Sequence, residues 1–211
     1  KEEKILIMAL ESEDSKQITN AIKDVLSDCI LSRGIKIEKL ATFDIEYLFL
    51  NVRAKSVGET VEVNITCPDD NETQVQVEID IDSIKVQKAD THSDTIKLDN
   101  DLSLQMNYPS LNQFIETNFE VGEEKSEVEQ SLNVIMSCIK QVYSNDEAWD
   151  ASDCSKKELR DFVEQMNSKQ FKQVEDFFNT MPKLAHTLKV TNPNTKVKSD
   201  VTIEGLASFF S

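Results

Sequence analysis

The chain has 211 residues, with 39 acidic against 23 basic residues and a formal net charge of -16, and it is long enough to bury a hydrophobic core without disulfides or metals. The excess of carboxylates argues against nucleic-acid binding, which needs clustered lysine and arginine. Four scattered cysteines without a CxxC pair are typical of a reducing compartment, and no apolar run is long enough to span a bilayer.

The first part of the sequence predicts helices. Residues 1–12 have a helical pattern, and Asp14 is a candidate cap for a second helix with apolar residues at i, i+3, i+4 and i+7. Gly34 stands where a left-handed residue would end this helix, and Thr42 is a candidate N-cap of the next one. Because the chain begins at Lys1 inside a helical pattern, we expect a further N-terminal segment before it.

The helix predicted over residues 43–57 is apolar around nearly its whole circumference. One side carries Phe43, Tyr47, Leu50 and Ala54, and the other carries Ile45, Leu48, Phe49 and Val52. A helix with two apolar sides must be buried on more than one face. Two interpretations stay open: a central core helix, or a helix with one face covered only by another subunit.

Beyond this helix the apolar residues recur every 2 residues, as in a strand, and no longer every 3.6 residues, as in a helix. Residues 61–67 and 75–81 alternate apolar and polar side chains on either side of the turn at residues 68–72, which predicts an antiparallel hairpin with one solvated face. Shorter strands are expected at residues 84–86 and 96–106. The sequence therefore predicts a small antiparallel sheet of three to five strands.

From Pro109 onward the helical period returns. Three boxes of the type Ser-x-x-Glu/Gln mark helix starts: Ser110, Ser126 and Ser155. The apolar stripe after the second box runs through Ile139 and Val142 to Tyr143, so one helix is expected across this whole segment. A further helix is expected from about Ser168.

The tail is predicted to form a β-hairpin and a short terminal helix. The apolar residues expected to face each other in the hairpin are Leu188 and Val190 on one strand and Val201 and Ile203 on the other. The complete order indicates an α+β protein with N-terminal helices, a small antiparallel sheet, C-terminal helices and a terminal β-hairpin. We divide it into residues 1–57, 58–108 and 109–211, packed as one compact unit or as two subdomains.

The sequence offers no recognisable catalytic or cofactor-binding apparatus. Catalysis of the Ser-His or Cys-His type needs a histidine beside a nucleophile, and the two histidines, His92 and His186, are interpreted as surface or structural residues. Cysteine and histidine lack zinc spacing, and the carboxylate-rich segments 68–72 and 145–153 lack the EF-hand frame that calcium binding would favour. Four glycines leave no glycine-rich phosphate loop. We expect no enzyme activity, no cofactor and no metal.

Two aromatic doublets near the C-terminus are candidates for partner contacts. Adjacent aromatic residues on a helix cannot both face one narrow core seam, so one member of each pair is available to a partner, unless both pack against the sheet. The candidate partner-binding residues are Phe177, Phe178, Phe209 and Phe210 of the doublets, with Phe43, Tyr47, Phe49 and Arg53 of the apolar helix.

Several sequence blocks resemble one family of phage proteins. Phe-Asp-Ile-Glu-Tyr-Leu-Phe occupies residues 43–49, and Arg-Ala-Lys-Ser-x-Gly-Glu occupies residues 53–59. With the opening at residues 1–12 and a closing Glu-Gly-Leu-x-x-Phe-Phe at residues 204–210, they resemble the baseplate hub assembly proteins of T-even (T4-like) contractile-tailed phages. The resemblance covers the first third of the chain and its end.

The resemblance implies a non-enzymatic role in which the chain binds other baseplate hub proteins, as a hub component or as an assembly chaperone. It implies action in the host cytoplasm during assembly, with the virion tail baseplate as a further location. Some relatives have paired cysteines in the C-terminal hairpin, where this chain has Val190 and Asn194, which argues against a metal there. Self-association stays open. A second class of function is an acidic regulatory or decoy protein that binds a basic host factor.

Overall fold

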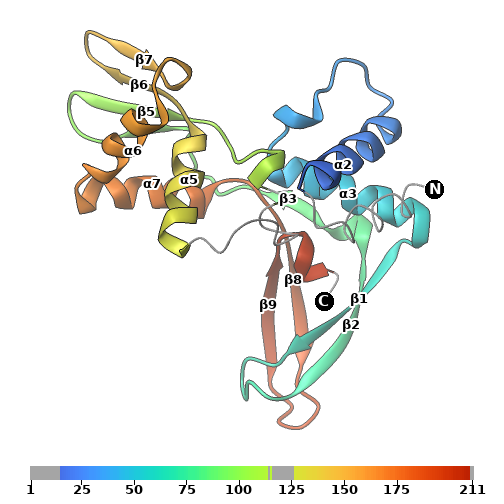
Figure 1. The fold of residues 1–211 in the computed structure, drawn as a ribbon. Helices are drawn as coiled ribbons and strands as arrows, with labels where there is room; N and C mark the ends of the chain where they lie inside the picture. Colours follow the sequence, from blue (N-terminus) through green and yellow to red (C-terminus); the bar gives the residue numbers. More distant parts are fainter. Residues whose placement is uncertain (1–14, 114, 116–125, 210–211) are drawn as a thin grey trace. The chain divides into compact units, whose positions relative to one another are not determined.

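A computed structural model describes residues 15–113, 115 and 126–209 of the chain (Figure 1). Residue contacts divide the chain into two compact units. Unit 1 comprises Lys1–Gln87 with Pro182–Ser211, and unit 2 comprises Lys88–Met181. Unit 1 is therefore built from both ends of the sequence, which differs from the three consecutive parts expected above. The helix expected at residues 1–12 lies outside the described residues.

The α+β class is confirmed, and in unit 1 it takes the form of helices beside two antiparallel sheets. The elements of unit 1 are α2 (Ser15–Cys29), η1 (Ile37–Lys39), α3 (Thr42–Val57), β1 (Thr60–Thr66), β2 (Gln74–Asp80), η2 (Ile81–Ser83), β3 (Lys85–Gln87), β8 (Lys183–Thr191), β9 (Lys198–Glu204) and η4 (Leu206–Phe209). β1 and β2 form one sheet, and the other has the order β3-β8-β9. The expected small sheet is thus distributed over several sheets.

The two N-terminal helices of unit 1 follow their apolar patterns closely. α2 buries the stripe that includes Ile22 and Leu26, both 0 % exposed, and it contacts α3 and η1. The prediction for Gly34 was wrong, because α2 ends at Cys29 and Gly34 adopts its positive φ of 85° in the following turn. The N-cap of α3 is Ala41, which lacks a capping side chain, instead of Thr42. The helix therefore depends on its tertiary contacts.

The hairpin β1–β2 is confirmed, with residues 60–66 lying opposite residues 80–74 in unbroken register. Alternate residues of β1 are buried, and the intervening polar residues are exposed. The C-terminal hairpin is confirmed as β8–β9, and Leu188 lies opposite Val201 as expected. In this register, however, Ile203 lies opposite His186, so the two apolar pairs are not both in direct opposition.

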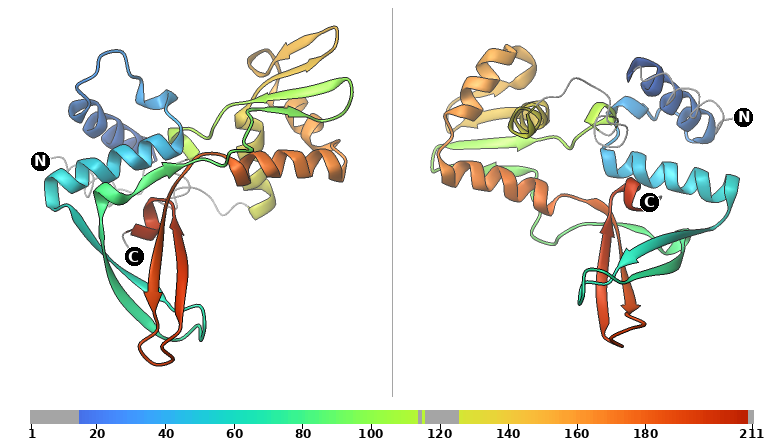
Figure 2. Two further views of the ribbon diagram at one scale, coloured as in Figure 1. Left: turned by 180° about the vertical axis from the view of Figure 1, so that it is seen from behind. Right: turned by 60° about the horizontal axis from the view of Figure 1, so that its bottom comes forward.

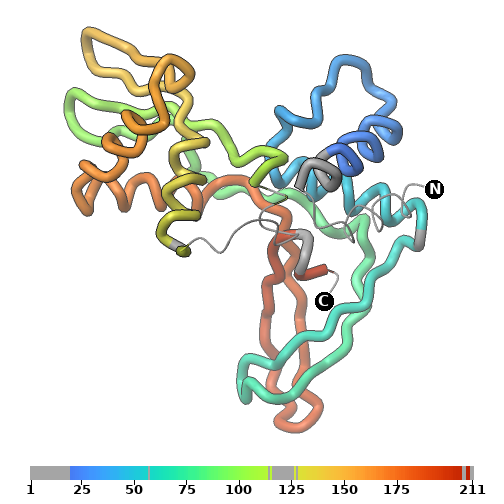
Figure 3. Tube along the Cα trace, viewed as in Figure 1, coloured from blue at the N-terminus to red at the C-terminus, as the bar shows by residue number. Residues whose placement is uncertain are grey.

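The two hairpins of unit 1 lie side by side and are tied together at their tips (Figures 2 and 3). Asn192 in the β8–β9 turn is only 1 % exposed, and its Nδ2 donates to Asp69 Oδ1 and Oδ2 at 3.1 Å and to Asp70 Oδ2 at 2.8 Å. Its Oδ1 accepts the backbone N–H groups of Asn194 and Thr195. One buried amide therefore shapes its own turn and binds the opposite one.

The Asp70 carboxylate of this tie is strongly held in its ionised form. Hydrogen bonds from the Thr73 side chain, the backbone N–H groups of Thr73 and Glu72, and the Asn192 amide hold the pKa of Asp70 well below its usual range. Thr195 Oγ1 donates to Asp69 Oδ2. The stabilisation from Asp70 is present above the pKa of an unfolded aspartate and is lost as the pH falls into the acid range.

In the part of unit 2 that the structure describes, helices lie on one face of a four-stranded antiparallel sheet. Its elements are β4 (Thr95–Lys97), β5 (Leu102–Met106), α5 (Glu127–Cys138), β6 (Ile139–Ser144), β7 (Ala148–Asp150), η3 (Ala151–Asp153), α6 (Lys156–Glu164) and α7 (Ser168–Thr180). The strand order is β4-β5-β6-β7. Ile96, Leu104 and Met106 of the sheet join Ile135, Val163 and Phe177 of the helices in one buried cluster.

The single helix expected from Ser126 to Tyr143 was wrong, because α5 ends at Cys138 and β6 begins at Ile139. β5 and β6 shift register between Gln105, which pairs with Gln141, and Met106, which pairs with Ile139. The extra residue, Lys140, forms a bulge that lets Ile139 and Val142 both face the helices. Ile139 and Val142 are three residues apart, which resembles the spacing of a helix, but the bulge in β6 is the cause of this spacing.

Side-chain caps fix the starts of the helices in unit 2. Ser126 accepts from the N–H of Glu129, and Ser155 forms a complete capping box with Glu158, as the sequence predicts. The Ser155 side chain and N–H group lower the pKa of the Glu158 carboxyl. A further capping box joins Asn167 to Gln170 at the start of α7, where the sequence pattern had placed the helix start but not its cap.

We expect Asn192→Ala to destabilise the paired hairpins of unit 1 by about 1–3 kcal/mol, because Asp69 and Asp70 lose the donor that joins the two turns. Hydrogen-exchange mass spectrometry of β1, β2, β8 and β9 measures this loss. Asn194→Ala is the matched control, since Asn194 lies in the same turn, is exposed and donates to Thr73 Oγ1. Equal losses of protection in both variants would contradict the role assigned to Asn192.

Candidate functional site

The helix α3 carries four of the eight candidate partner-binding residues, and the structure separates their surroundings. Phe43 is 8 % exposed, whereas Tyr47, Phe49 and Arg53 are half-buried. On the second apolar side of the helix, Ile45 is fully buried, and Leu48, Phe49 and Val52 remain half-buried. We call Leu48, Phe49 and Val52 the half-buried face of α3. Phe43 therefore contributes to the core of unit 1, and the half-buried face keeps apolar area in contact with solvent.

Two of the sequence blocks of the family resemblance, at residues 43–49 and 204–210, belong to neighbouring elements of unit 1. α3, which contains the first block, contacts η4, which belongs to the closing block. Phe209 of η4 is 0 % exposed, and a Cβ at Gly205 would lie 3.8 Å from Glu46 Oε1 of α3. Gly205 also adopts a positive φ of 73°, which favours glycine. Segments far apart in the sequence thus form one packed region. Phe210 lies outside the described residues.

The other aromatic doublet belongs to a cluster inside unit 2. Phe177 is 3 % exposed, and its ring centroid lies 5.1 Å from that of Phe178 in an edge-to-face arrangement. It also lies 5.1 Å from the centroid of His92 and 5.8 Å from that of Tyr108. Phe177 therefore packs in the core of its own unit, while Phe178 is half-buried beside it. A partner-binding role for either residue stays a prediction.

His92 has a structural environment, with both ring nitrogens in hydrogen bonds. Nδ1 lies 3.1 Å from Thr180 Oγ1, and Nε2 lies 3.0 Å from Tyr108 Oη. Burial lowers the pKa of His92 below its ordinary value, and the charge of Lys88 acts in the same direction while Asp94 opposes it. The neutral ring is therefore the form that the folded unit favours.

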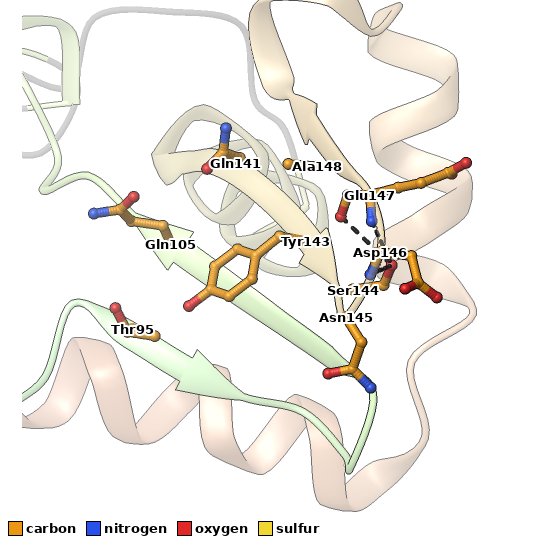
Figure 4. A pocket seen from close by; sticks show the side chains of 9 residues that line it. All are labelled: Thr95, Gln105, Gln141, Tyr143, Ser144, Asn145, Asp146, Glu147 and Ala148. Atoms are coloured by element: carbon orange, nitrogen blue, oxygen red, sulfur yellow. Dashed lines mark hydrogen bonds between the residues drawn. The ribbon is translucent and has the colours of Figure 1, made fainter.

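The face of the four-stranded sheet opposite the helices is polar and partly hollow. Cross-strand pairing aligns Thr95, Gln105 and Gln141 in one row on this open face, and Tyr143 lies in the neighbouring row opposite Ser103. Figure 4 shows these side chains around a shallow hollow of about 460 Å³, which the turn at residues 144–148 borders at one end. Sequence analysis missed Tyr143 as a surface residue because it placed this segment on a helix. The open face of this sheet therefore presents polar side chains and one half-buried tyrosine.

The two carboxylate-rich segments differ from calcium loops in their contacts. Asp69 and Asp70 accept from the amide of Asn192, and Asp70 also accepts from Thr73 and Glu72, so these oxygens have partners within unit 1. Among the residues that the structure describes, no group of three or more His, Cys, Asp or Glu is placed to hold a metal ion. Within the same residues, no helix has the length and apolar character that a membrane crossing needs.

Comparison with known protein families gives a match over the whole sequence. A family model described as "T4 bacteriophage base plate protein" matches residues 1–211. No curated protein and no solved structure matches the chain.

We expect unit 2 to lose stability as the pH falls from 8 to 5, because the pKa of His92 is lower in the folded state than in the unfolded chain. The stabilisation is complete above the unfolded value of about 6.5 and is lost as the ring becomes protonated. Fluorescence of Trp149, the single tryptophan of the chain, can follow thermal unfolding of unit 2 at each pH. His92→Gln should flatten the dependence, and His186→Gln should retain it. A wild-type slope in His92→Gln would contradict the assignment.

Proposed function

The chain belongs to the T4 bacteriophage base plate protein family, and from that premise we propose that it is a non-enzymatic hub assembly protein acting through contacts with other hub proteins. The family gives the protein a structural role in the phage baseplate. The hub assignment rests on the resemblance of residues 43–49, 53–59 and 204–210 to hub assembly proteins. The observation that supports it most directly is the contact of α3, which carries residues 43–49, with η4 of the closing block in unit 1.

The half-buried face of α3 is the surface that we assign to a hub protein. α3 already contacts α2, β3, β8 and two short 3₁₀ helices of its own unit, so much of its circumference is used for folding. Leu48, Phe49 and Val52 still retain partial exposure, although they lie in or beside the first resemblance block. Burying apolar area that remains in solvent stabilises an association by roughly 25 cal/mol for each Å² removed from water. Of the other candidate residues, Tyr47 and Arg53 of α3 stay with this proposal as half-buried contacts, and Phe178 stays a separate candidate in unit 2.

The absence of an enzymatic role is part of the same proposal. Both nitrogens of His92 are engaged within unit 2, and the Asp69–Asp70 pair is engaged within unit 1. Groups held in this way are structural, whereas catalytic acids and bases need access to a substrate. The charge of -16 favours a basic surface on the partner and rapid association through electrostatic steering.

We expect Phe49→Ala to weaken capture of a hub protein from the source phage by about tenfold, because the variant removes an apolar contact from the half-buried face. Affinity capture from co-expressed hub proteins, followed by titration of the captured component, measures the effect. Tyr143→Ala is the matched control, since it also removes a half-buried aromatic ring but lies on the open face of unit 2. Circular dichroism of both variants verifies that they fold.

Three outcomes would count against this proposal. Loss of capture in Tyr143→Ala alone would indicate that the partner binds unit 2 instead of α3. Salt-sensitive capture of a basic host protein, with no hub component, would favour the regulatory or decoy alternative. A measured hydrolytic activity that disappears with a carboxylate substitution would contradict a non-enzymatic role. Mass spectrometry of purified virions separates the two forms of the proposal, because a hub component stays in the particle and an assembly chaperone leaves it.

A further inference from the structure

Unit 1 carries an exposed loop that is both apolar and basic. Residues 31–36, which we call the basic loop, follow α2 and contain Arg33 and Lys36 but no carboxylate. Leu31 is 95 % exposed and Ile35 is 46 % exposed. In a chain with a net charge of -16, this loop is a local reversal of the surface charge. Exposed apolar side chains beside charges of one sign are typical of a binding surface.

Unit 2 carries a segment with the opposite charge. Residues 145–153, which we call the acidic tip, contain four carboxylates and no lysine or arginine, and all four of these residues are exposed: Asp146, Glu147, Asp150 and Asp153. Trp149 lies among them on the edge strand β7 and is 44 % exposed. Asn145 Nδ2 donates to Asp101 Oδ1 at 2.9 Å, which brings another carboxylate to the tip. The acidic tip therefore presents the exposed indole ring of Trp149 among negatively charged side chains.

We propose that copies of this chain associate through the basic loop of one copy and the acidic tip of another. Leu31 and Ile35 would pack on Trp149, while Arg33 and Lys36 would lie among the carboxylates. The two surfaces are complementary, because each has exposed apolar side chains and the two have opposite charges. Because both surfaces belong to one chain, they are always present in equal amounts.

This contact joins two different surfaces and is therefore heterologous. Each copy that uses its basic loop keeps a free acidic tip, and each copy that uses its acidic tip keeps a free basic loop. Such a head-to-tail arrangement closes into a ring or extends into a chain of copies, whereas an isologous contact would stop at a dimer. This inference is independent of the hub assignment, because it concerns a different surface of unit 1 from the half-buried face of α3.

The native cysteines allow a direct test with the full chain. Cys29 is exposed and ends α2 two residues before Leu31, the first residue of the basic loop, and Cys154 is partly exposed and directly follows the acidic tip. Cys67 and Cys138 are buried, and burial raises the pKa of the Cys138 thiol to about 11. Cys154→Ser leaves Cys29 as the accessible thiol, and Cys29→Ser leaves Cys154. The two variants, one carrying an affinity tag, are mixed and treated with a thiol-specific bifunctional reagent.

We expect a covalent dimer that contains one copy of each variant, with far less product from either variant alone. Wild-type chain should give a ladder of larger products. Closure of the reagent within single wild-type chains, without a mixed dimer, would show an intramolecular contact and overturn the proposal. Dimers within each variant alone would show a symmetric contact and would also overturn it, as would the absence of any crosslinked product.

Charge reversal provides a second test that leaves the cysteines unchanged. Arg33→Glu with Lys36→Glu should weaken self-association, measured by sedimentation velocity, by about tenfold or more. Adding Asp146→Lys and Glu147→Lys to the same chain should restore part of the association, because the acidic tip then has two lysines for the new glutamates and no excess of carboxylates. Lys189→Glu with Lys198→Glu is the matched control, since it makes the same change in exposed residues of the β8–β9 hairpin. A similar loss in this control would overturn the specific contact.

Discussion

The antiparallel pairing of β3 with β8 is the interaction on which the architecture of unit 1 depends. Gln87 lies opposite Lys183, and its side chain also donates to the carbonyl oxygen of Ala185 at 3.1 Å. This pairing closes a loop that contains all of unit 2, so its entropic cost must be offset by apolar burial around residues such as Leu184, which is 0 % exposed. With β8 in place, η4 reaches α3, and the turn containing Asn192 reaches Asp69.

α3 connects this architecture to the proposed role in the baseplate. Its two apolar sides allow it to contact helices, strands and the C-terminal turn of its own unit at the same time. A helix used in this way gains its order from the tertiary structure, in agreement with the absence of a side-chain cap at Ala41. The half-buried face is consequently held on a rigid support, and a rigid surface loses less conformational entropy when a partner binds.

Sequence reasoning succeeded where neighbouring residues determine the structure and failed where distant residues do. The alternation in residues 61–67 is a local signal, and the boxes at Ser126 and Ser155 are local caps, so these elements were predictable. Lys140 was not, because a bulge is defined by the register with β5. His92 looked like a loop residue, although Thr180 and Tyr108 bring it into an aromatic cluster. Of the candidate partner residues, Phe177 and Phe209 proved to be buried for the same reason.

The tie at Asn192 also has a consequence for the lifetime of the protein among host proteases. A protease binds several residues of a substrate in extended form, so an exposed turn is cleaved only after it opens locally. In unit 1, opening either turn breaks the hydrogen bonds from the Asn192 amide to the carboxylates of Asp69 and Asp70. Hairpin turns are normally the first segments to be cleaved. Here the β1–β2 turn and the β8–β9 turn each make the other more costly to open, which slows cleavage at both.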